Sequence, residues 1–376
     1  MKSIGIITIH RIHNYGSALQ AYALQHYIQK NCSANAEIID YIFPNEFHKT
    51  PVHYSLVKKI RIELGKLKDI LKGKTGRIDR RFNKFKDDFL VLSERSYGSV
   101  DEINSNPPVY EIYMTGSDQV WNYKTLKNDP VMYLQFAPKD KPRVAFGASF
   151  AQKDVPSEYY PLLRNYLDSY RSIGVREQNS IEIIKRMGVS PTIPLTMTCD
   201  PTMLLDSSEY DEIAERSEIK PTGKYILCYF LDYAFNPEPA LTKVLEQIQH
   251  KLNIPIVMLG QRKSNFNGEI KVINDIGPCE FAYLMKHAEY VLTSSFHGLM
   301  FSLINRKPFT AIIPDPKSGD CRIKDMLDYL KMSKCYIQAD EANPKIFEGK
   351  VYDDEAENSI KSLITSSQKY LKEICK

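Results

Sequence analysis

Long hydrophobic runs are missing from this chain of 376 residues. The first apolar run, residues 4–9, ends at His10 and Arg11 and is too short for the hydrophobic region of a secretion signal. No later run approaches the roughly 18 residues that span a membrane. The sequence therefore predicts a chain with neither a cleaved signal nor a transmembrane helix.

Cysteine patterns that bind metals or form disulfides are also missing. The seven cysteines are scattered, with no C-x-x-C pair and no histidines at metal-ligand spacing. Such a distribution is typical of reduced, mostly buried thiols in a cytoplasmic protein. We therefore expect no metal site and a cytoplasmic location.

Charge of one sign is not in large excess. The 50 basic and 46 acidic residues leave a formal net charge of +4, and we expect no nucleic-acid partner. Basic residues gather within residues 58–86, where twelve Lys or Arg lie among apolar residues. This pattern predicts a basic, amphipathic helical insertion over about residues 55–92. It suits either contact with an anionic membrane surface or lipid-linked substrate, or a solvated helical face with extended lysines.

Strand-like and helix-like segments alternate along the chain, and its length suits two domains. The β-rich run at residues 4–9 predicts the central first strand of a parallel sheet. We predict an α/β protein with two Rossmann-like domains, residues 1–206 and 224–376, joined by a polar linker. The amphipathic last segment, residues 354–376, predicts a helix that can pack back on the N-terminal domain.

Residues 289–314 predict a compact βαβ unit with a polar turn before its helix. Ligands of parallel α/β sheets bind beyond the carboxyl ends of the strands, where a helix N-terminus favours anions. A single histidine at such a place is also a common structural residue. Four residues at this turn and helix start are candidate ligand contacts: Ser294, Ser295, His297 and Gly298.

The loop after the first strand is a second candidate site. Asn14, Tyr15 and Gly16 lie before a helix that Ser17 is expected to cap. These three residues either contact a ligand or shape the turn, because Asn and Gly tolerate left-handed backbone angles.

The strand predicted at residues 111–114 ends in a third polar cluster. An aromatic ring beside polar side chains suits a sugar, and the alternative is an ordinary capped helix with a packed Trp. The candidate contacts are Ser117, Asp118, Gln119 and Trp121.

Arg176 follows the strand predicted at residues 172–175 and precedes a helix. Its planar guanidinium suits a carboxylate or phosphate, and the alternative is a surface salt bridge with Glu177 or another neighbour. Further along, Lys317 lies in a loop after a strand, either near an anion bound by His297 or in solvent. Asp200, which precedes a proline, predicts a structural turn.

Four stretches together resemble the polysaccharide pyruvyl transferase family. They are NYGSALQAYAL, GSDQVWN, the region from SIGVREQNS to CDPTMLL, and SSFHGLMFSLINRKPF. The resemblance implies a fold similar to two-domain GT-B glycosyltransferases, with the active site between the two domains. It also implies transfer of the pyruvyl group of phosphoenolpyruvate (PEP) onto two hydroxyls of a sugar. The products would be a cyclic ketal, in a surface polysaccharide such as a capsule or exopolysaccharide, and phosphate.

The same resemblance implies the roles of particular residues. His297 and Arg176 match the catalytic histidine and arginine of the family, and Lys317 matches a lysine of a D-P-K loop. Lys307 or Arg322 are alternatives to Lys317 for binding phosphate. PEP needs fixed cations, and His297 is the best placed residue to give and take protons. No cofactor is implied beyond PEP as donor substrate.

The acceptor and two other function classes stay open. An acceptor sugar on a polyprenyl diphosphate would bring the protein to the inner membrane face, where the basic insertion would attract it. A GT-B glycosyltransferase using a nucleotide sugar is one alternative, although the second half shows no Gly-rich phosphate loop. A non-catalytic glycan- or anion-binding protein is the other.

Overall fold

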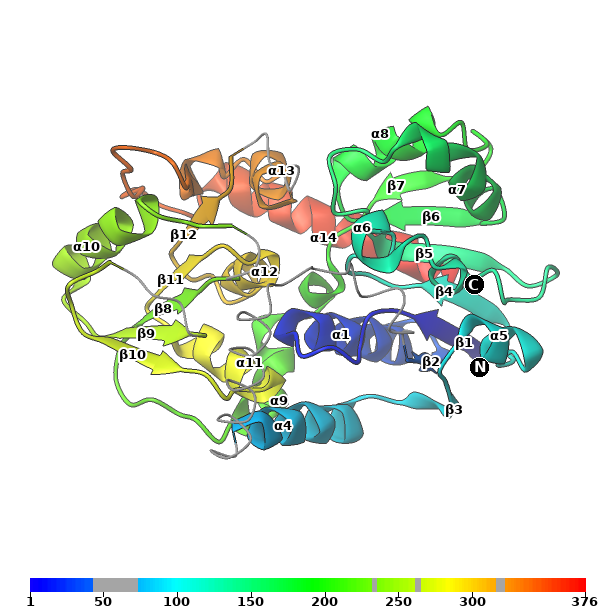
Figure 1. Cartoon of the computed structure of the whole chain (residues 1–376), viewed down its shortest axis with the longest axis horizontal. Coiled ribbons are helices and arrows are strands. Elements are labelled where there is room, and N and C mark those ends of the chain that lie inside the picture. Colours follow the sequence, from blue (N-terminus) through cyan, green and yellow to red (C-terminus); the bar gives the residue numbers. More distant parts are fainter. Residues whose placement is uncertain (43–73, 232–234, 261–264, 316–321) are drawn as a thin grey trace, which may run out of the picture.

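The computed structural model describes residues 1–42, 74–231, 235–260, 265–315 and 322–376. Two parallel β-sheets with helices against their faces form the molecule, one sheet in each half of the chain (Figure 1). This arrangement confirms the predicted α/β class with two Rossmann-like halves.

The N-terminal sheet has the strand order β3-β2-β1-β4-β5-β6-β7, with all neighbours parallel. The order reverses between β1 and β4, and a ligand crevice is expected beyond the strand ends at such a reversal. The strands are β1 (Lys2–Ile7), β2 (Ala34–Tyr41), β3 (Leu92–Tyr97), β4 (Ile112–Thr115), β5 (Arg143–Ala148), β6 (Ser172–Val175) and β7 (Leu195–Met197). The helices are α1 (Tyr15–Asn31), α4 (Lys74–Phe89), α5 (Val100–Ser105), α6 (Tyr123–Leu126), α7 (Tyr160–Leu167), α8 (Gln178–Arg186) and the short 3-10 helices η1 (Pro130–Tyr133), η2 (Ser157–Tyr159) and η3 (Pro201–Leu204).

The C-terminal sheet repeats this plan in the order β10-β9-β8-β11-β12-β13, again all parallel. Its reversal lies between β8 and β11, the strand that leads to His297. The strands are β8 (Ile226–Tyr229), β9 (Ile256–Leu259), β10 (Ile270–Ile273), β11 (Tyr290–Thr293), β12 (Phe309–Ile313) and β13 (Tyr336–Gln338). The helices of this half are α10 (Ala240–Leu252), α11 (Pro278–His287), α12 (Phe296–Ile304), α13 (Arg322–Tyr329), α14 (Asp354–Ile374) and the 3-10 helix η6 (Ser333–Cys335).

Strands near the middle of both sheets are buried on both faces, as parallel strands covered by helices must be. Every residue of β6, β8 and β11 is buried, and their sequences are short runs rich in Val, Ile and Leu. Helices α1 and α12 lie in the middle of the molecule, between the two sheets (Figure 1). The residues at the N-termini of these two helices therefore approach one another from opposite halves.

The segment expected to be a polar linker is helical instead. It forms the 3-10 helix η4 (Ser207–Tyr210) and helix α9 (Asp211–Glu215). Asp206 and Glu209 form a capping box at its start, and Tyr210 and Ile213 are buried in the core. The polar composition had masked this helical structure and its two buried apolar side chains.

Helix α14 crosses from the C-terminal half to the N-terminal half (Figure 1). The hydroxyl of Ser367 accepts a hydrogen bond from the backbone N of Cys199 at 2.7 Å. The hydroxyl of Tyr370 donates to the carbonyl of Ala145 at 3.1 Å. The last helix of the chain thus packs on the N-terminal sheet.

Helix α4 is the described part of the basic segment, and it lies against the C-terminal half. Arg77 pairs with Asp275 at 2.6 Å, and Arg81 pairs with Glu218 at 2.9 Å and with Glu280 at 3.4 Å. These arginines therefore neutralise acidic residues of the other half. The remainder of the predicted insertion, residues 43–73, lies outside the described residues.

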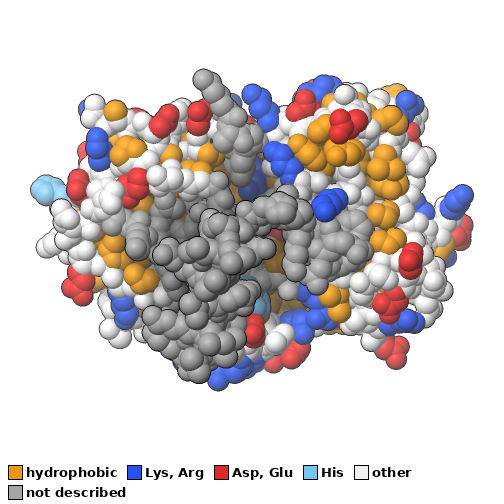
Figure 2. All heavy atoms as spheres, in the orientation of Figure 1, with side chains coloured by type: hydrophobic (Ala, Val, Ile, Leu, Met, Phe, Trp, Pro, Cys, Tyr) orange, Lys and Arg blue, Asp and Glu red, His pale blue; other side chains and the backbone are white. Residues whose placement is uncertain are grey.

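In the part of the chain that the structure describes, no helix is both long enough and apolar enough to cross a membrane. On the face drawn in Figure 2, outside the grey residues, basic and acidic side chains are intermingled.

Candidate active site

Arg176 lies directly after β6 and is completely buried. Its Nε donates to Oε1 of Glu177 and its Nη1 donates to Oδ2 of Asp200, both at 2.9 Å. The guanidinium carbon also lies 4.2 Å from the ring centroid of Phe296, which belongs to α12 of the other half. Burial alone would lower the pKa of Arg176, but the carboxylates of Glu177, Asp200 and Asp118 raise it, so the side chain is a fixed cation. The salt bridge with Glu177 exists, but it is buried and not at the surface.

One nitrogen of this guanidinium has no hydrogen-bond partner among the described residues. Nη2 of Arg176 is buried, while Nε and Nη1 are both paired. A buried, charged donor without a partner is costly, and in a native protein it calls for an explanation such as a bound ion or a catalytic role. Arg176 therefore offers one directed N–H group to an anion.

His297 is the second residue of α12, and it approaches Arg176 from the C-terminal half. Ser295 caps this helix, because its hydroxyl accepts from the backbone N of Gly298 at 3.3 Å. The imidazole is 6% exposed, and its Nε2 lies 3.5 Å from Oδ2 of Asp200. That separation is too long for a good hydrogen bond, and Nε2 has no other partner within the described ranges. His297 thus carries a second buried nitrogen that is available to a ligand.

Asp200 connects these two residues, and its role was missed in the sequence, where only a turn was predicted. It does form the turn, as the N-cap of η3, but its Oδ2 also contacts both Arg176 and His297. Burial would raise the pKa of Asp200, but the charges of His297 and Arg176 hold it well below its usual range. Asp200 is therefore ionised and balances the charge of the buried guanidinium of Arg176.

Gly16, at the start of α1, lies against the imidazole of His297. A Cβ added at Gly16 would overlap with the ring atoms Cγ and Nδ1. Asn14 caps α1 by accepting from the backbone N of Ser17, so the expectation that Ser17 is the cap was wrong. The Tyr15 ring stacks on Phe82 of α4 and Phe281 of α11. Burial, with a smaller contribution from Glu280, raises the pKa of Tyr15 to about 12.

The turn after β4 lies next to the same cluster. The hydroxyl of Ser117 lies 3.5 Å from Oδ2 of Asp200, and Asp118 accepts a hydrogen bond from Ser17 of α1. Asp118 has a left-handed backbone angle, φ 73°, an arrangement often found near functional sites. The side chain of Gln119 is half-buried and accepts from Asn122 at 2.8 Å.

Trp121, in contrast, is part of the core. It is 1% exposed, stacks on Tyr133 with ring centroids 5.5 Å apart, and donates from Nε1 to the carbonyl of Met132 at 3.3 Å. The prediction that this ring contacts a sugar is corrected, because both faces and the N–H group are engaged within the N-terminal half. The alternative, a packed Trp, describes it.

The remaining candidates occupy different places. Ser294 is buried at the end of β11, where its hydroxyl accepts from the backbone N of Leu231 at 3.3 Å. The guanidinium carbon of Arg322 lies 6.0 Å from the centroid of the Phe296 ring, close to Arg176. Lys307 lies before the amino-terminal end of β12, whereas His297 follows the carboxyl end of β11. Lys307 is therefore no alternative phosphate ligand. Lys317 lies outside the described residues.

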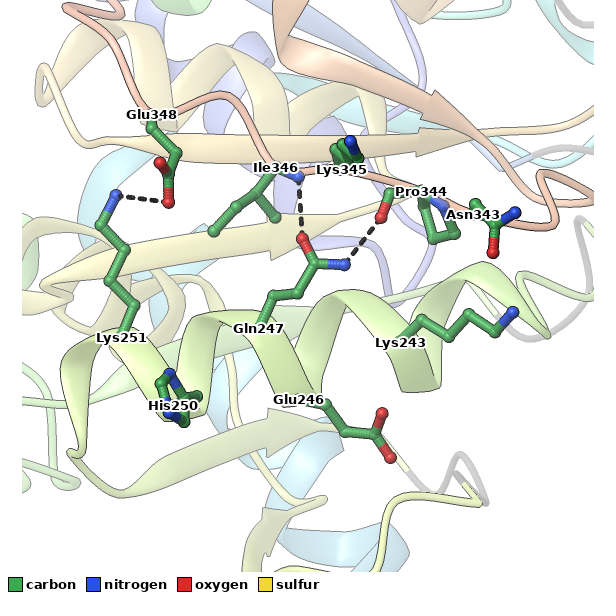
Figure 3. Close-up of a pocket in the computed structure, with 10 residues that line it drawn as sticks. All are labelled: Lys243, Glu246, Gln247, His250, Lys251, Asn343, Pro344, Lys345, Ile346 and Glu348. Atoms are coloured by element: carbon green, nitrogen blue, oxygen red, sulfur yellow. Dashed lines mark hydrogen bonds and ion pairs between the residues drawn. The ribbon is translucent and has the colours of Figure 1, made fainter.

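A groove away from this cluster lies between α10 and residues 343–348 (Figure 3). The polar side chains that line this groove form hydrogen bonds and an ion pair with other groups of the groove. Gln247 donates to the carbonyl of Pro344 at 2.7 Å and accepts from the backbone N of Ile346 at 3.1 Å, while Lys251 pairs with Glu348 at 3.6 Å. This groove therefore lacks the unpaired buried donors that mark the site between the domains.

The cluster of Arg176, Asp200 and His297 can bind an anion and exchange a proton. One carboxylate oxygen, Oδ2 of Asp200, accepts from Nη1 of Arg176 and lies 3.5 Å from Nε2 of His297, so side chains from both halves meet at it. Among the described residues, no group of three or more His, Cys, Asp or Glu side chains is arranged to hold a metal ion. The chemistry that this cluster supports is therefore anion binding with acid and base catalysis by a histidine.

Solved structures with the same fold come from nucleotide-sugar enzymes. A UDP-GlcNAc 2-epimerase from Methanocaldococcus jannaschii matches with a TM-score of 0.51 at 13% identity, covering 97% of this chain and 99% of that chain. The Neisseria meningitidis UDP-GlcNAc 2-epimerase bound to UDP-GlcNAc matches with a TM-score of 0.50 at 10% identity, covering 100% and 94% of the two chains. Arabidopsis thaliana UGT89C1, complexed with UDP-L-rhamnose, matches with a TM-score of 0.50 at 9% identity, covering 100% and 98%. At these identities the likeness shows the GT-B fold alone.

No curated protein matches the chain. A family model described as polysaccharide pyruvyl transferase matches residues 14–316, a range that contains Asn14, Arg176, Asp200 and His297. Because this match extends over most of the sequence, the chain belongs to the polysaccharide pyruvyl transferase family.

Proposed function

We propose that the protein transfers the pyruvyl group of PEP to two hydroxyls of a sugar, forming a cyclic ketal and releasing phosphate. The observation that carries this proposal is that Arg176 and His297, from opposite domains, both approach Oδ2 of Asp200, while Nη2 of Arg176 and Nε2 of His297 are buried without a hydrogen-bond partner among the described residues. One is a fixed cationic donor suited to a carboxylate or phosphate, and the other belongs to a residue that exchanges protons near neutral pH. Both the phosphate and the carboxylate of PEP are attached to its central carbon, so its reaction requires a cationic donor and a proton-exchanging residue close together.

The reaction balances with these groups. A proton is added to the methylene carbon of PEP, one sugar oxygen bonds to the central carbon, the bond from that carbon to the phosphate oxygen breaks, and the second sugar oxygen takes its place. The two hydroxyl protons end on the new methyl group and on the phosphate. In this scheme His297 donates and accepts the protons, while Arg176 and Arg322 bind the anionic groups of PEP, with Lys317 as a further candidate. No cofactor takes part.

The acceptor in this proposal is a sugar of a surface polysaccharide under construction, in a capsule or an exopolysaccharide. A polyprenyl-diphosphate carrier and peripheral contact with an anionic membrane, from a cytoplasmic location, form its least supported part. Arg77, Arg80 and Arg81 of α4 pair with acidic residues of the C-terminal half and are not free for a lipid surface. In this proposal the membrane contact is assigned to the basic residues within residues 58–72.

The proposal is tested by calorimetric titration with PEP and, separately, with UDP and GDP, together with an assay of phosphate release from PEP in the presence of candidate sugars. We expect saturable PEP binding and acceptor-dependent phosphate release. Arg176→Lys keeps a positive charge beside Asp200 and Glu177 but loses the planar fork, so it is expected to fold and to bind PEP at least about tenfold more weakly.

His297→Ala is expected to bind PEP but to lower turnover by at least about 10²-fold, as is typical for loss of a general acid or base. His250→Ala, in the groove of Figure 3, is the matched control and should keep full turnover. Binding of UDP or GDP without PEP would reject the proposal in favour of a nucleotide-sugar enzyme. PEP binding without phosphate release under any acceptor would favour a binding protein.

A further inference from the structure

Asp200 has one carboxylate oxygen fixed by its own turn. Oδ1 accepts from the backbone N of Thr202 at 3.0 Å and from the Thr202 hydroxyl at 2.7 Å. The side chain is also completely buried at the start of η3. These bonds fix the plane of the carboxylate, so the position of the second oxygen, Oδ2, is fixed as well.

Oδ2 contacts groups from both domains. Nη1 of Arg176, in the N-terminal domain, donates to it at 2.9 Å, and Nε2 of His297, in the C-terminal domain, lies 3.5 Å away. Because Asp200 is ionised, this oxygen can only accept hydrogen bonds. A single atom therefore determines how near the histidine comes to the arginine.

The imidazole reaches this position only because residue 16 is a glycine. The His297 ring lies so close to the first turn of α1 that a Cβ at residue 16 would overlap with it. Gly16 and Asp200 thus contact His297 from the same domain, through the ring atoms Cγ and Nδ1 and through Nε2 respectively.

We propose that Asp200 is a positioning residue which, with Gly16, fixes His297 of one domain beside Arg176 of the other. This inference rests on the proposed function only in naming PEP as the donor. Asp200 has no need to contact PEP, since it acts through the two side chains that do. Glu177 holds Arg176 independently through Nε at 2.9 Å, so PEP affinity should survive a change at Asp200 better than turnover does.

Gly16→Ala separates these effects, because it obstructs His297 and leaves Arg176, Glu177 and Asp200 in place. We expect kcat for phosphate release to fall about 10²-fold, the cost of a misplacement of about 1 Å, while the PEP dissociation constant changes less than about threefold. The matched control is Gly76→Ala in α4, where an added Cβ meets nothing within 4 Å. Equal kcat values for the two alanine variants would overturn the inference.

A stability measurement tests the same contact without any assay of activity. Gly16→Ala should lower the thermal midpoint by roughly 2–4 °C in the otherwise unchanged protein. In a His297→Gly background, which removes the ring and also the His297 Cβ that would lie 2.4 Å from the added Cβ, the same change should have no effect. A penalty that persists in this background would reject the contact, whatever the protein does with PEP.

Asp200→Asn completes the test. Its amide oxygen can still accept from Thr202, but its NH₂ group would face Nη1 of Arg176, donor against donor, at the position that also contacts Nε2 of His297. We expect kcat to fall about 10²-fold and the PEP dissociation constant to rise less than about fivefold. A large rise in the PEP dissociation constant together with an unchanged kcat would overturn the inference. If the unchanged protein released no phosphate from PEP, the proposed function would fail, and the thermal comparison would still decide the contact.

Discussion

Buried carboxylates control the acid stability of this protein at the residue scale. Asp40, at the end of β2, accepts from His10 at 2.9 Å and also from Arg11 and Ser96. Burial would raise the pKa of Asp40, but these hydrogen bonds and the charge of His10 lower it far below its usual range. Ionised Asp40 therefore stabilises the folded state.

The sign of the pH dependence follows from that shift. The pKa of Asp40 is lower in the folded than in the unfolded chain, so its contribution is complete above the unfolded value of about 3.9 and is lost as pH falls towards the folded value. Asp40→Asn should therefore lower the urea concentration at the midpoint of unfolding most above pH ~5, and progressively less below pH ~4. Urea unfolding from pH 7 to 3 measures this difference, and the exposed Asp140→Asn is the control. A difference that stays constant across the range would contradict the assignment.

The same scale explains what the sequence could and could not predict about the site. Arg176 and His297 each follow a buried strand, and that local pattern alone indicates a ligand edge. Asp200 is far from Arg176 and His297 along the chain, so no local sequence pattern predicts that its Oδ2 contacts them. Trp121 was predicted wrongly for the opposite reason. Its polar neighbours in sequence suggested a ring that stacks on a sugar, whereas Tyr133, the aromatic residue that stacks on it, belongs to a separate short helix.

At the scale of elements, α4 joins the two halves through one buried arginine. Arg81 is 10% exposed and contacts Glu280, which is 2% exposed, as well as Glu218 and the carbonyl of Asp275. Neighbouring Arg80 pairs with the same Glu218 at 3.0 Å, but its side chain is 60% exposed. Two adjacent arginines on one helix therefore differ mainly in burial.

Arg81→Ala should lower the free energy of unfolding by about 3 kcal/mol, because it leaves Glu280 buried without its cation. The lower end of the usual range is expected, since Glu280 still accepts from the backbone N of Gly277 at 2.8 Å. Arg80→Ala should cost at most about 1 kcal/mol, as exposed ion pairs do. Urea unfolding of both variants checks this contrast, and similar losses would mean that burial of the pair is unimportant.

Elements themselves were well predicted where the apolar runs are short and bounded. Strand β6 has the predicted bounds, residues 172–175, because this short apolar run ends at the charged Arg176. The basic segment was harder, since its acidic partners lie far away in sequence. When their partners are unknown, lysines and arginines on an amphipathic segment suggest a membrane-binding surface. In α4, however, the arginines form contacts between domains.

At the scale of the whole molecule, the last turns of α14 make the two halves depend on each other. Within residues 367–376, Ser367 and Tyr370 bind Cys199 and Ala145 of the N-terminal half, and Arg171 donates to the carbonyl of Ile374 at 2.7 Å. Leu371 and Ile374 are buried in the same core cluster as Phe146. The end of the chain thus stabilises the N-terminal sheet from which Arg176 extends.

Removal of residues 367–376 should therefore destabilise the N-terminal half, although the deleted residues follow the C-terminal half in sequence. Calorimetry of the full chain is expected to give one transition, because the halves share α14, α4 and the site. The truncated chain should give two, with the N-terminal half melting at least about 5 °C lower, since several buried side chains are lost together. Tyr370→Phe is the matched control: it keeps the ring and loses only the hydrogen bond to Ala145, worth about 1 kcal/mol. A truncated chain that melts in one transition at the original temperature would mean that α14 is peripheral, and that the halves are coupled through the site and α4 alone.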